Sequence, residues 1–219
     1  IKWVRNDAAN LPEDDLYIRW GCTSNIPCNN VLNTAEAIHQ VNDKAAFRKL
    51  CADNGLAPTT FLSLGDWAHH VDPLMFVEEE GHLDLKAGIQ YIGRPSKHAQ
   101  GRNVHVITNT KHAKDVHDKY GEGNYYISEY IDKEAEYRVA VVQGRAVWVA
   151  QKTPADPDAI AWNVAQGGRF DNVRWDNWPL KVVKVAIEAF NLSKLDFGGV
   201  DVMVGKDGSV GVLEINSAP

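Results

Sequence analysis

The C-terminal end of the chain carries oxygen-bearing side chains in a pattern that suits a divalent metal ion. Asp201 lies in one short apolar run, and Glu214 and Asn216 lie in the next, with Lys206-Asp207-Gly208 between the two runs. Two such runs around a tight turn predict an antiparallel hairpin, in which residues i and i+2 of a strand share a face. Pairing across the turn would bring Asp201 close to Glu214 and Asn216. These hard oxygen ligands suit Mg²⁺, and Mn²⁺ has similar preferences.

On the residues alone, plainer explanations stay open. Carboxylates are mostly exposed in folded proteins, so the acidic side chains of the last hairpin could be solvated on an outward strand face. Lys44 in the first turn of a helix and Arg94 before Pro95 could be surface charges. Glu136 and Arg138, two residues apart on a strand, could form an ordinary ion pair on one face.

Helices and antiparallel strands must hold these side chains in place. Asn33-Thr34-Ala35-Glu36 resembles a capping box and predicts the start of a helix. A second helix is predicted to begin at Asn42 or Asp43 and to end at Asn54-Gly55, because glycine accepts the left-handed cap conformation. The remaining predicted elements are strands at 88–95 and 104–107, a helix at 111–120, a strand at 125–131, a hairpin at 137–152, a helix at 179–191 and the last hairpin at 200–215. This mixture predicts an α+β protein with antiparallel sheets.

Composition narrows the class of protein. The 219 residues carry a net charge of -6, with 44% hydrophobic and 24% charged residues, as is typical of a folded globular protein. The negative charge argues against a nucleic-acid-binding surface, and the longest apolar run, Ala146–Ala150, is too short to span a membrane. The cysteines Cys22, Cys28 and Cys51 are few and odd in number, which disfavours a disulfide framework. No close Cys/His pairs recur with the spacing of a zinc finger or ribbon, which disfavours a zinc site. We therefore expect a cytoplasmic protein that binds neither nucleic acid nor membrane.

The C-terminal motifs resemble a known superfamily. Gly199-Val200-Asp201 followed by Leu213-Glu214-Ile215-Asn216 is similar to the C-terminal signature of the ATP-grasp superfamily. Upstream motifs follow in the matching order, and the resemblance covers about residues 40 to 219. These upstream motifs are the Asp-Lys pair at 43–44, Ile92-Gly93-Arg94-Pro95, a glycine loop around Gly101, Ile127-Ser128-Glu129-Tyr130-Ile131, Glu136-Tyr137-Arg138-Val139, Lys152, and Asn163 before Gly167-Gly168. The last of them is similar to the asparagine and glycine pair of ribosomal-protein glutamate ligases.

This resemblance implies a fold and a division of the chain. ATP-grasp proteins have an α+β fold in which two lobes with antiparallel sheets clasp ATP. The expected organisation is a reduced N-terminal segment at 1–40, a small lobe with nearby linker elements at 41–130 and a large lobe with the metal site at 131–219. Arg94 stands where the family usually has lysine. Only about forty residues precede the Asp-Lys pair, where many relatives carry a Rossmann-like domain.

The resemblance also implies roles for individual residues. The metal ligands would be Asp201, Glu214 and Asn216, and the catalytic residues near the γ-phosphate and acyl phosphate would be Arg138 and Lys152. The cofactor-binding residues would be Lys44 and Arg94 at the phosphates, Glu129, Tyr130 and Ile131 near the purine and ribose, Glu136, and Asn163 near the phosphate or metal. The loop from Ser96 to Asn103 could close over the phosphates and exclude water.

The expected activity is that of a ligase that uses ATP and Mg²⁺ or Mn²⁺. It would activate a carboxylate as an acyl phosphate and join it to an amine, and its substrate would be a small carboxylate, an amino acid or a peptide. Two alternatives remain: an ATP-grasp phosphotransferase, in which a hydroxyl attacks the γ-phosphate, and a non-catalytic nucleotide-binding module.

Overall fold

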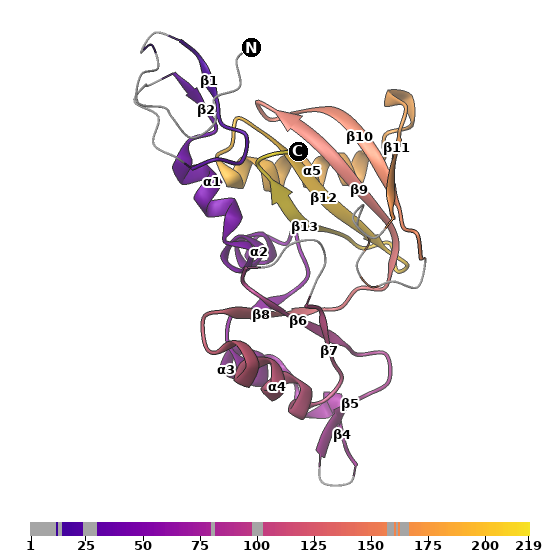
Figure 1. Ribbon diagram of the computed structural model, residues 1–219. Helices are drawn as coiled ribbons and strands as arrows, with labels where there is room; N and C mark the ends of the chain where they lie inside the picture. Colours follow the sequence, from indigo (N-terminus) through magenta and orange to yellow (C-terminus); the bar gives the residue numbers. More distant parts are fainter. Residues whose placement is uncertain are drawn as a thin grey trace.

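The structure is a computed structural model, and it describes residues 12, 15–23, 30–79, 82–97, 103–156, 160, 162 and 167–219. Its largest element is a five-stranded antiparallel sheet in the C-terminal half of the chain (Figure 1). The strands lie in the order β11 (Arg169–Asn172), β10 (Arg145–Thr153), β9 (Lys133–Val142), β12 (Phe197–Gly205) and β13 (Val210–Asn216). Helix α5 (Leu180–Ser193) runs across this sheet, and α1 (Ala35–Asn42) and α2 (Lys44–Asp53) lie beside β13.

A smaller sheet forms the other end of the molecule. Its order is β3 (Thr60–Phe61), β8 (Tyr125–Glu129), β6 (Tyr91–Pro95) and β7 (His105–Ile107), and every pairing is antiparallel. Helices α3 (Leu64–His70) and α4 (Thr110–Tyr120) pack on it (Figure 1). The remaining elements are the hairpin β4 (Phe76–Glu79) and β5 (His82–Leu85), the parallel pair β1 (Tyr17–Ile18) and β2 (Val31–Leu32), and the short helices η1 (Pro73–Met75) and η3 (Trp175–Asn177).

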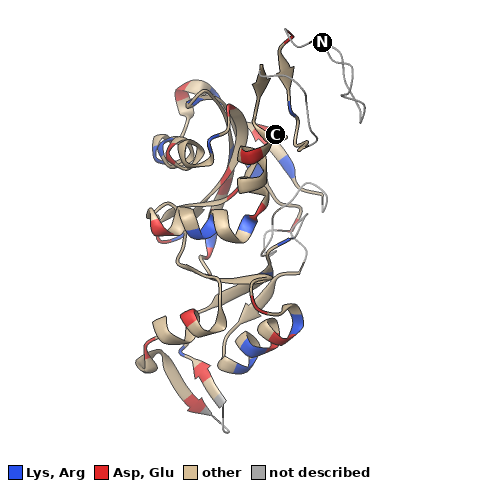
Figure 2. Ribbon diagram, turned by 90° about the vertical axis from the view of Figure 1, so that its left-hand side faces the viewer, with Lys and Arg blue, Asp and Glu red and all other residues tan. Residues whose placement is uncertain are grey.

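The helix boundaries follow from local capping chemistry. The side chain of Thr34 accepts a hydrogen bond from the amide of Ala37, and that of Asp43 accepts one from Ala46, so both predicted helix starts are confirmed. Helix α4 carries several lysine and aspartate residues, and its buried residues are Ala113 and Val116 (Figure 2). Lysine–aspartate pairs four residues apart, such as Lys111 with Asp115 at 2.7 Å, support this exposed helix.

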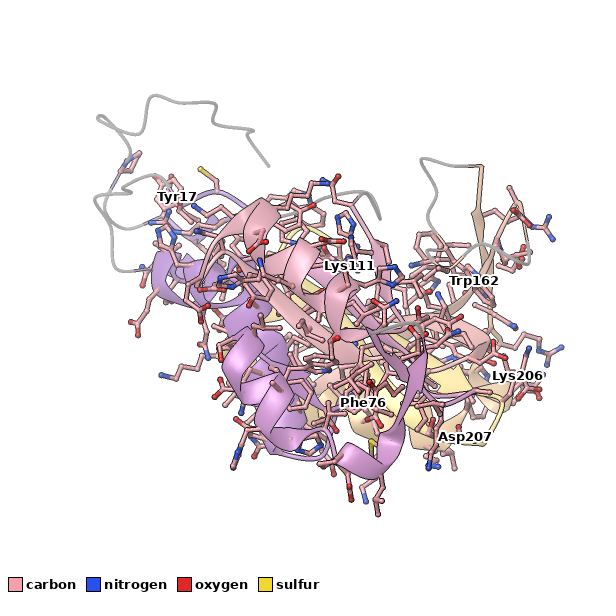
Figure 3. All side chains as sticks on the ribbon, turned by 90° about the horizontal axis from the view of Figure 1, so that it is seen from below. Tyr17, Phe76, Lys111, Trp162, Lys206 and Asp207 are labelled. Carbon is pink, nitrogen blue, oxygen red and sulfur yellow. The ribbon has the colours of Figure 1, made fainter. Side chains whose placement is uncertain are left out.

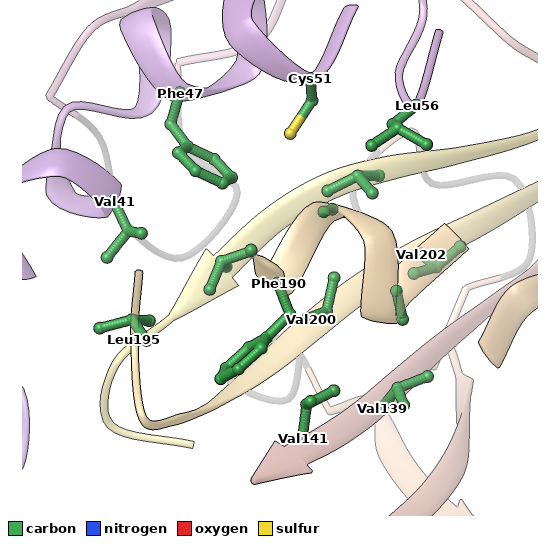
Figure 4. Packing of buried hydrophobic residues seen from close by; sticks show 14 of the residues in the cluster. Val41, Phe47, Cys51, Leu56, Val139, Val141, Phe190, Leu195, Val200 and Val202 are labelled. Atoms are coloured by element: carbon green, nitrogen blue, oxygen red, sulfur yellow. The ribbon is translucent and has the colours of Figure 1, made fainter. Parts of the chain in front are cut away.

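Two apolar clusters stabilise the two ends of the molecule. The larger one joins the inner face of the five-stranded sheet to α1, α2 and α5, and it includes Phe47, Phe190 and Val200 (Figure 4). The smaller one joins the four-stranded sheet to α3 and α4 around Trp67 and Ile107. Helix α2 therefore packs with the C-terminal sheet, although it precedes the smaller sheet in sequence. The division of the chain at residues 41 and 131 stays a prediction.

The two sheets are joined by a very short connection. Strand β8 ends at Glu129 and β9 begins at Lys133, so residues 130–132 alone connect these two strands. The Asp132 carbonyl accepts a hydrogen bond of 2.9 Å from the amide of Lys206, which holds this connection against the β12–β13 turn. No helix among the described residues is long and apolar enough to cross a membrane.

The predicted helices and hairpins are confirmed to within a few residues. Gln143 and Gly144 both have positive φ, at 48° and 70°, as a two-residue turn between β9 and β10 requires. Helix α3, the hairpin β4–β5 and strand β11 were not among the predicted elements. They are short, and short elements carry little periodicity of their own.

Candidate functional site

One face of the five-stranded sheet is charged, and the opposite face is apolar. On β9, Val139 and Val141 belong to the core cluster, so the alternating residues Glu136 and Arg138 point away from α5. The register places Lys152 opposite Glu136 and Asp201 opposite Arg138. Four charged side chains from three neighbouring strands therefore share one face.

A β-bulge in β13 adds Glu214 to this face. Asp201 pairs with Glu214 and the adjacent Val202 pairs with Val212, so Leu213 is the extra residue. Without the bulge, Val212 and Ile215 would point to opposite faces, because they are three residues apart. With the bulge, both enter the core cluster while Glu214 points to the charged side. Asn216, two residues further on, shares the face of Glu214.

The centre of the face is a chain of buried ion pairs. Arg138 donates to both oxygens of Asp201, at 2.7 and 2.9 Å, and Lys152 lies 3.4 Å from the second of these oxygens. Lys152 also pairs with Glu136. The side chains of Glu136 and Asp201 are each only 3% exposed. Burial alone lowers the pKa of both Arg138 and Lys152, but the adjacent carboxylates outweigh burial and raise it, so both stay charged.

Glu214 forms a second charged group at the edge of the face. Lys44, from the first turn of α2, lies 2.5 Å from one Glu214 oxygen, and the Asn216 amide nitrogen donates to the other at 3.2 Å. Burial favours the neutral acid, but Lys44 and Asn216 outweigh it and lower the pKa of Glu214 to about 2. The Glu214 side chain is therefore ionised at neutral pH.

Arg94 enters the site region from the smaller sheet. It pairs with Tyr126 in the register of β6 and β8, on the face opposite to the one that α3 and α4 cover. Its Nε is buried and has no hydrogen-bond partner among the described residues. Burial lowers the pKa of Lys133 against the opposing effect of Glu136. The charges of Lys152 and, least, Arg94 lower it further, so Arg94 lies within electrostatic reach of the charged face of the other sheet.

Aromatic rings cover the cations. Phe170 lies opposite Lys152 in the register of β11 and β10, and its ring centroid is 4.8 Å from the Arg138 guanidinium. The Lys133 ammonium lies 4.6 Å from the Trp162 ring centroid. Figure 3 labels Trp162 on the same side of the molecule as the β12–β13 turn with Lys206 and Asp207. Such cation–π contacts stabilise a positive charge that burial has removed from water.

The residues predicted near a purine lie on the connection between the sheets. Glu129 is exposed and accepts a 3.1 Å hydrogen bond from Thr59. Tyr130 is half-buried, and burial raises the pKa of its hydroxyl. Ile131 packs against β12 so closely that a Cβ on Gly205 would lie 2.7 Å from it. These residues lie just before β9, the strand that carries Glu136 and Arg138. Their role stays a prediction.

The donor set fits a magnesium ion by its chemistry. Mg²⁺ takes one or two carboxylates together with water and substrate phosphates, and Asp201 faces Glu214 across the strands. Asn216 supplies a third oxygen. Among the described residues, no three His, Cys, Asp or Glu side chains gather closely enough to hold a metal on their own. Asn163 and the loop residues 98–102 lie outside the described residues.

Two charged residues of the site region were missed by sequence reasoning. Arg48 is 5% exposed, and it donates to Ser128 of the smaller sheet at 3.2 and 3.3 Å and to the Leu213 carbonyl at the bulge at 3.1 Å. Lys133 is buried and pairs with Glu136 at 2.9 Å. The only sequence signal for Arg48 is its position one turn after Lys44. Spacing gives no signal for Lys133, because residues three apart on a regular strand point to opposite faces; a register shift between β9 and β12 next to Lys133 changes this.

Known proteins resemble the chain in sequence and in fold. No curated protein sequence matches it. Among solved structures, the ATP-grasp ligase PsnB complexed with a minimal precursor is 18% identical, with a TM-score of 0.57 over 87% of this chain and 56% of that one. D-alanine–D-alanine ligase from Bacillus anthracis is 15% identical, with a TM-score of 0.57 over 86% of this chain and 61% of that one. The macrocyclase MdnC from Microcystis aeruginosa, bound with the precursor peptide MdnA, is 16% identical, with a TM-score of 0.55 over 86% of this chain and 56% of that one.

These likenesses establish the fold, and the chain spans little more than half the length of those structures. Residues 81–219 match the RimK-like ATP-grasp domain, which is more than half of the chain. The predicted α+β fold with antiparallel sheets is confirmed, as is the resemblance read from the motifs. The chain belongs to the RimK-like ATP-grasp family.

Proposed function

We propose that this chain is the nucleotide-binding part of a ligase that uses ATP to join a carboxylate to an amine. One observation carries the proposal: Arg138, Asp201 and Glu214 form a row across three paired strands, with Lys152 beside them on the same face. Cations and carboxylates held this closely on a rigid sheet suit a polyphosphate and its metal ion. Phosphoryl transfer depends on such positioning and charge neutralisation more than on covalent help from the protein.

In the proposed reaction a substrate carboxylate oxygen attacks the γ-phosphorus of ATP. The bond from that phosphorus to the bridging oxygen breaks, ADP leaves, and an acyl phosphate forms. The amine nitrogen then attacks the acyl carbon, inorganic phosphate leaves, and the nitrogen loses a proton. Arg138 and Lys152 would neutralise the transferred phosphoryl oxygens, since both stay charged in their buried positions.

The remaining site residues would bind and orient the nucleotide. Lys44 and Arg94 would contact phosphates, and Glu129, Tyr130 and Ile131 would border the purine and ribose. Asp201, Glu214 and Asn216 would hold Mg²⁺, which would supply positive charge to neutralise the phosphates. The buried Nε of Arg94 has no hydrogen-bond partner in the described part of the chain, and this supports a contact with an anion, because a buried donor without a partner is costly.

An amino acid or peptide is the proposed substrate class. Structures with the same fold include PsnB and MdnC with their precursor peptides, and D-alanine–D-alanine ligase. A peptide or amino acid offers both groups that the reaction needs, a carboxylate and an amine.

The test is a product analysis with a site variant. The chain is incubated with ATP, Mg²⁺ and candidate amino acids or peptides, and nucleotide and phosphate are quantified. A ligase releases ADP and free phosphate in proportion to the joined product. A phosphorylated product would instead identify a phosphotransferase, and nucleotide binding without turnover on any substrate would identify a binding module.

Glu214→Gln separates these outcomes further. In an enzyme this change should reduce turnover by at least about a hundredfold, because a metal ligand is lost while the shape is kept. The matched control is Glu188→Gln on α5, where the side chain is exposed and its nearest lysine nitrogen is 3.9 Å away. The control should retain full turnover.

A further inference from the structure

Lys133 has no assigned role, yet it belongs to the buried ion-pair chain. We propose that Lys133 is a positioning residue: it neutralises Glu136 so that Lys152 can leave that carboxylate and bind the phosphates of the nucleotide. This inference rests on the proposed function, because it presupposes that Lys152 binds phosphate. Lys133 itself acts through its neighbours and is not placed on the reacting atoms.

Glu136 is shared between two lysines. One oxygen pairs with Lys152, and the other accepts a hydrogen bond of 2.9 Å from Lys133. The side chain of Glu136 is 3% exposed, and those of Lys152 and Lys133 are 6% and 9% exposed. Solvent therefore cannot replace either lysine when it moves away from the carboxylate.

The charges along the face alternate and end in a cation at each side. The order is Lys133, Glu136, Lys152, Asp201 and Arg138, which gives three positive and two negative charges. These five side chains together carry a net charge of +1. An anion that binds at Lys152 and Arg138 compensates this charge. Binding of that anion requires Lys152 to exchange a carboxylate oxygen for a phosphate oxygen.

The exchange leaves Glu136 with Lys133 as its partner. A buried carboxylate that loses its only counterion is strongly destabilising, whereas one that keeps a paired lysine is not. The Trp162 ring, 4.6 Å from the Lys133 ammonium, keeps that lysine next to the carboxylate. Without Lys133, Glu136 would hold Lys152 in place and oppose nucleotide binding.

The test is a double-mutant cycle on nucleotide affinity. Binding of adenylyl imidodiphosphate with Mg²⁺ is measured by calorimetry for the wild-type chain, Lys133→Met, Glu136→Gln and the double variant. Lys133→Met should weaken binding at least about tenfold when Glu136 is present, because the exchange then strands a buried charge. In the Glu136→Gln background the same change should weaken binding less than about twofold, because no carboxylate remains to be neutralised.

Matched variants guard against simple misfolding. Lys133→Arg keeps the charge and should restore affinity to within about threefold of wild type. Lys184→Met, an exposed lysine on α5, is the control for removing a lysine and should leave affinity unchanged. Thermal unfolding of each variant confirms that the compared chains are folded.

The outcomes separate this inference from the proposed function. If the wild-type chain does not bind the nucleotide analogue, the proposed function is wrong, and the positioning role that rests on it is wrong as well. If the wild type binds but Lys133→Met costs the same affinity with and without Glu136, the positioning role is wrong, and Lys133 contacts the nucleotide directly. If Lys133→Met has no effect in either background, Lys133 is a structural ion-pair partner only.

Discussion

Arg138 occupies both oxygens of Asp201, its Cα partner on the neighbouring strand, through hydrogen bonds of 2.7 and 2.9 Å. Asp201 is also the residue that we expect to hold a metal ion. The guanidinium and the metal ion therefore compete for the same oxygens. This competition is relieved when a phosphate takes Arg138, so metal and nucleotide are expected to bind together rather than singly.

The first prediction concerns this coupling. Calorimetry with Mg²⁺ alone should detect little binding to the wild-type chain, and clear binding once the nucleotide analogue is present. Arg138→Met should bind Mg²⁺ alone at least about threefold more tightly than wild type, because Asp201 is released, and should bind the nucleotide more weakly. Equal Mg²⁺ affinity of the two chains without nucleotide would contradict the competition.

The second prediction concerns pH and Glu214. Its pKa is lowered from 4.5 to about 2 in the folded chain, so its contribution to stability is complete above about pH 4.5 and is lost as the pH falls through about 2. The free energy of unfolding of wild type should therefore exceed that of Glu214→Gln by about 1 to 2 kcal/mol near pH 6, and this difference should shrink towards pH 2.5.

Denaturant unfolding across this pH range measures the effect. Glu188→Gln, at an exposed position on α5, should differ little from wild type throughout. A difference between wild type and Glu214→Gln that does not change with pH would show that Lys44 does not hold the carboxylate charged.

The third prediction concerns Arg48, which joins α2 to Ser128 in one sheet and to the bulge carbonyl of Leu213 in the other. Burial lowers the pKa of this guanidinium, because desolvation disfavours its charged form. Arg48→Met should destabilise the chain by about 2 to 4 kcal/mol, because the Leu213 carbonyl and the buried Ser128 hydroxyl lose their Arg48 donors. The Ser128 hydroxyl keeps the Thr60 hydroxyl as a donor. Denaturant unfolding measures the loss.

Hydrogen exchange locates the effect of this variant. The amides of β8 and of β13 near the bulge should exchange faster in Arg48→Met than in wild type. The matched control is Lys49→Met, whose lysine is exposed and pairs with Asp53, and it should cost less than about 0.5 kcal/mol. A loss confined to β13, with β8 unchanged, would contradict the joining role of Arg48.

The fourth prediction concerns the close contact of β6 with α4. A Cβ on Gly93 would lie 2.8 and 2.9 Å from the two methyl groups of Val116, a stiff residue in a helix. Gly93→Ala should therefore destabilise the chain by about 1 to 3 kcal/mol. A Cβ on Gly65 in α3 would make only an ordinary contact of 3.8 Å with the Ser63 hydroxyl, so Gly65→Ala should be neutral or stabilising by up to about 1 kcal/mol, because alanine favours a helix. Thermal unfolding compares the two, and equal midpoints would contradict the crowding at Gly93.

The sequence by itself determined the local elements. Thr34 and Asp43 cap the helices that they were predicted to begin, because a side-chain oxygen satisfies a nearby amide whatever the rest of the chain does. Gln143-Gly144 likewise makes a hairpin from two alternating runs. In the last hairpin, alternation put Glu214 and Asn216 on one face. These features depend on neighbours a few residues apart, so periodicity reveals them.

Which charged side chains form ion pairs was decided only by the tertiary structure. Lys44 and Glu214 are 170 residues apart in sequence, and they pair because α2 packs on β13. The roles of Arg48 and Lys133 depend on the Leu213 bulge and on the register of β9 with β10, which no local pattern specifies. The physical reason is that sheet register and lobe packing are set by the sum of many buried contacts, while capping and alternation are set by a few residues.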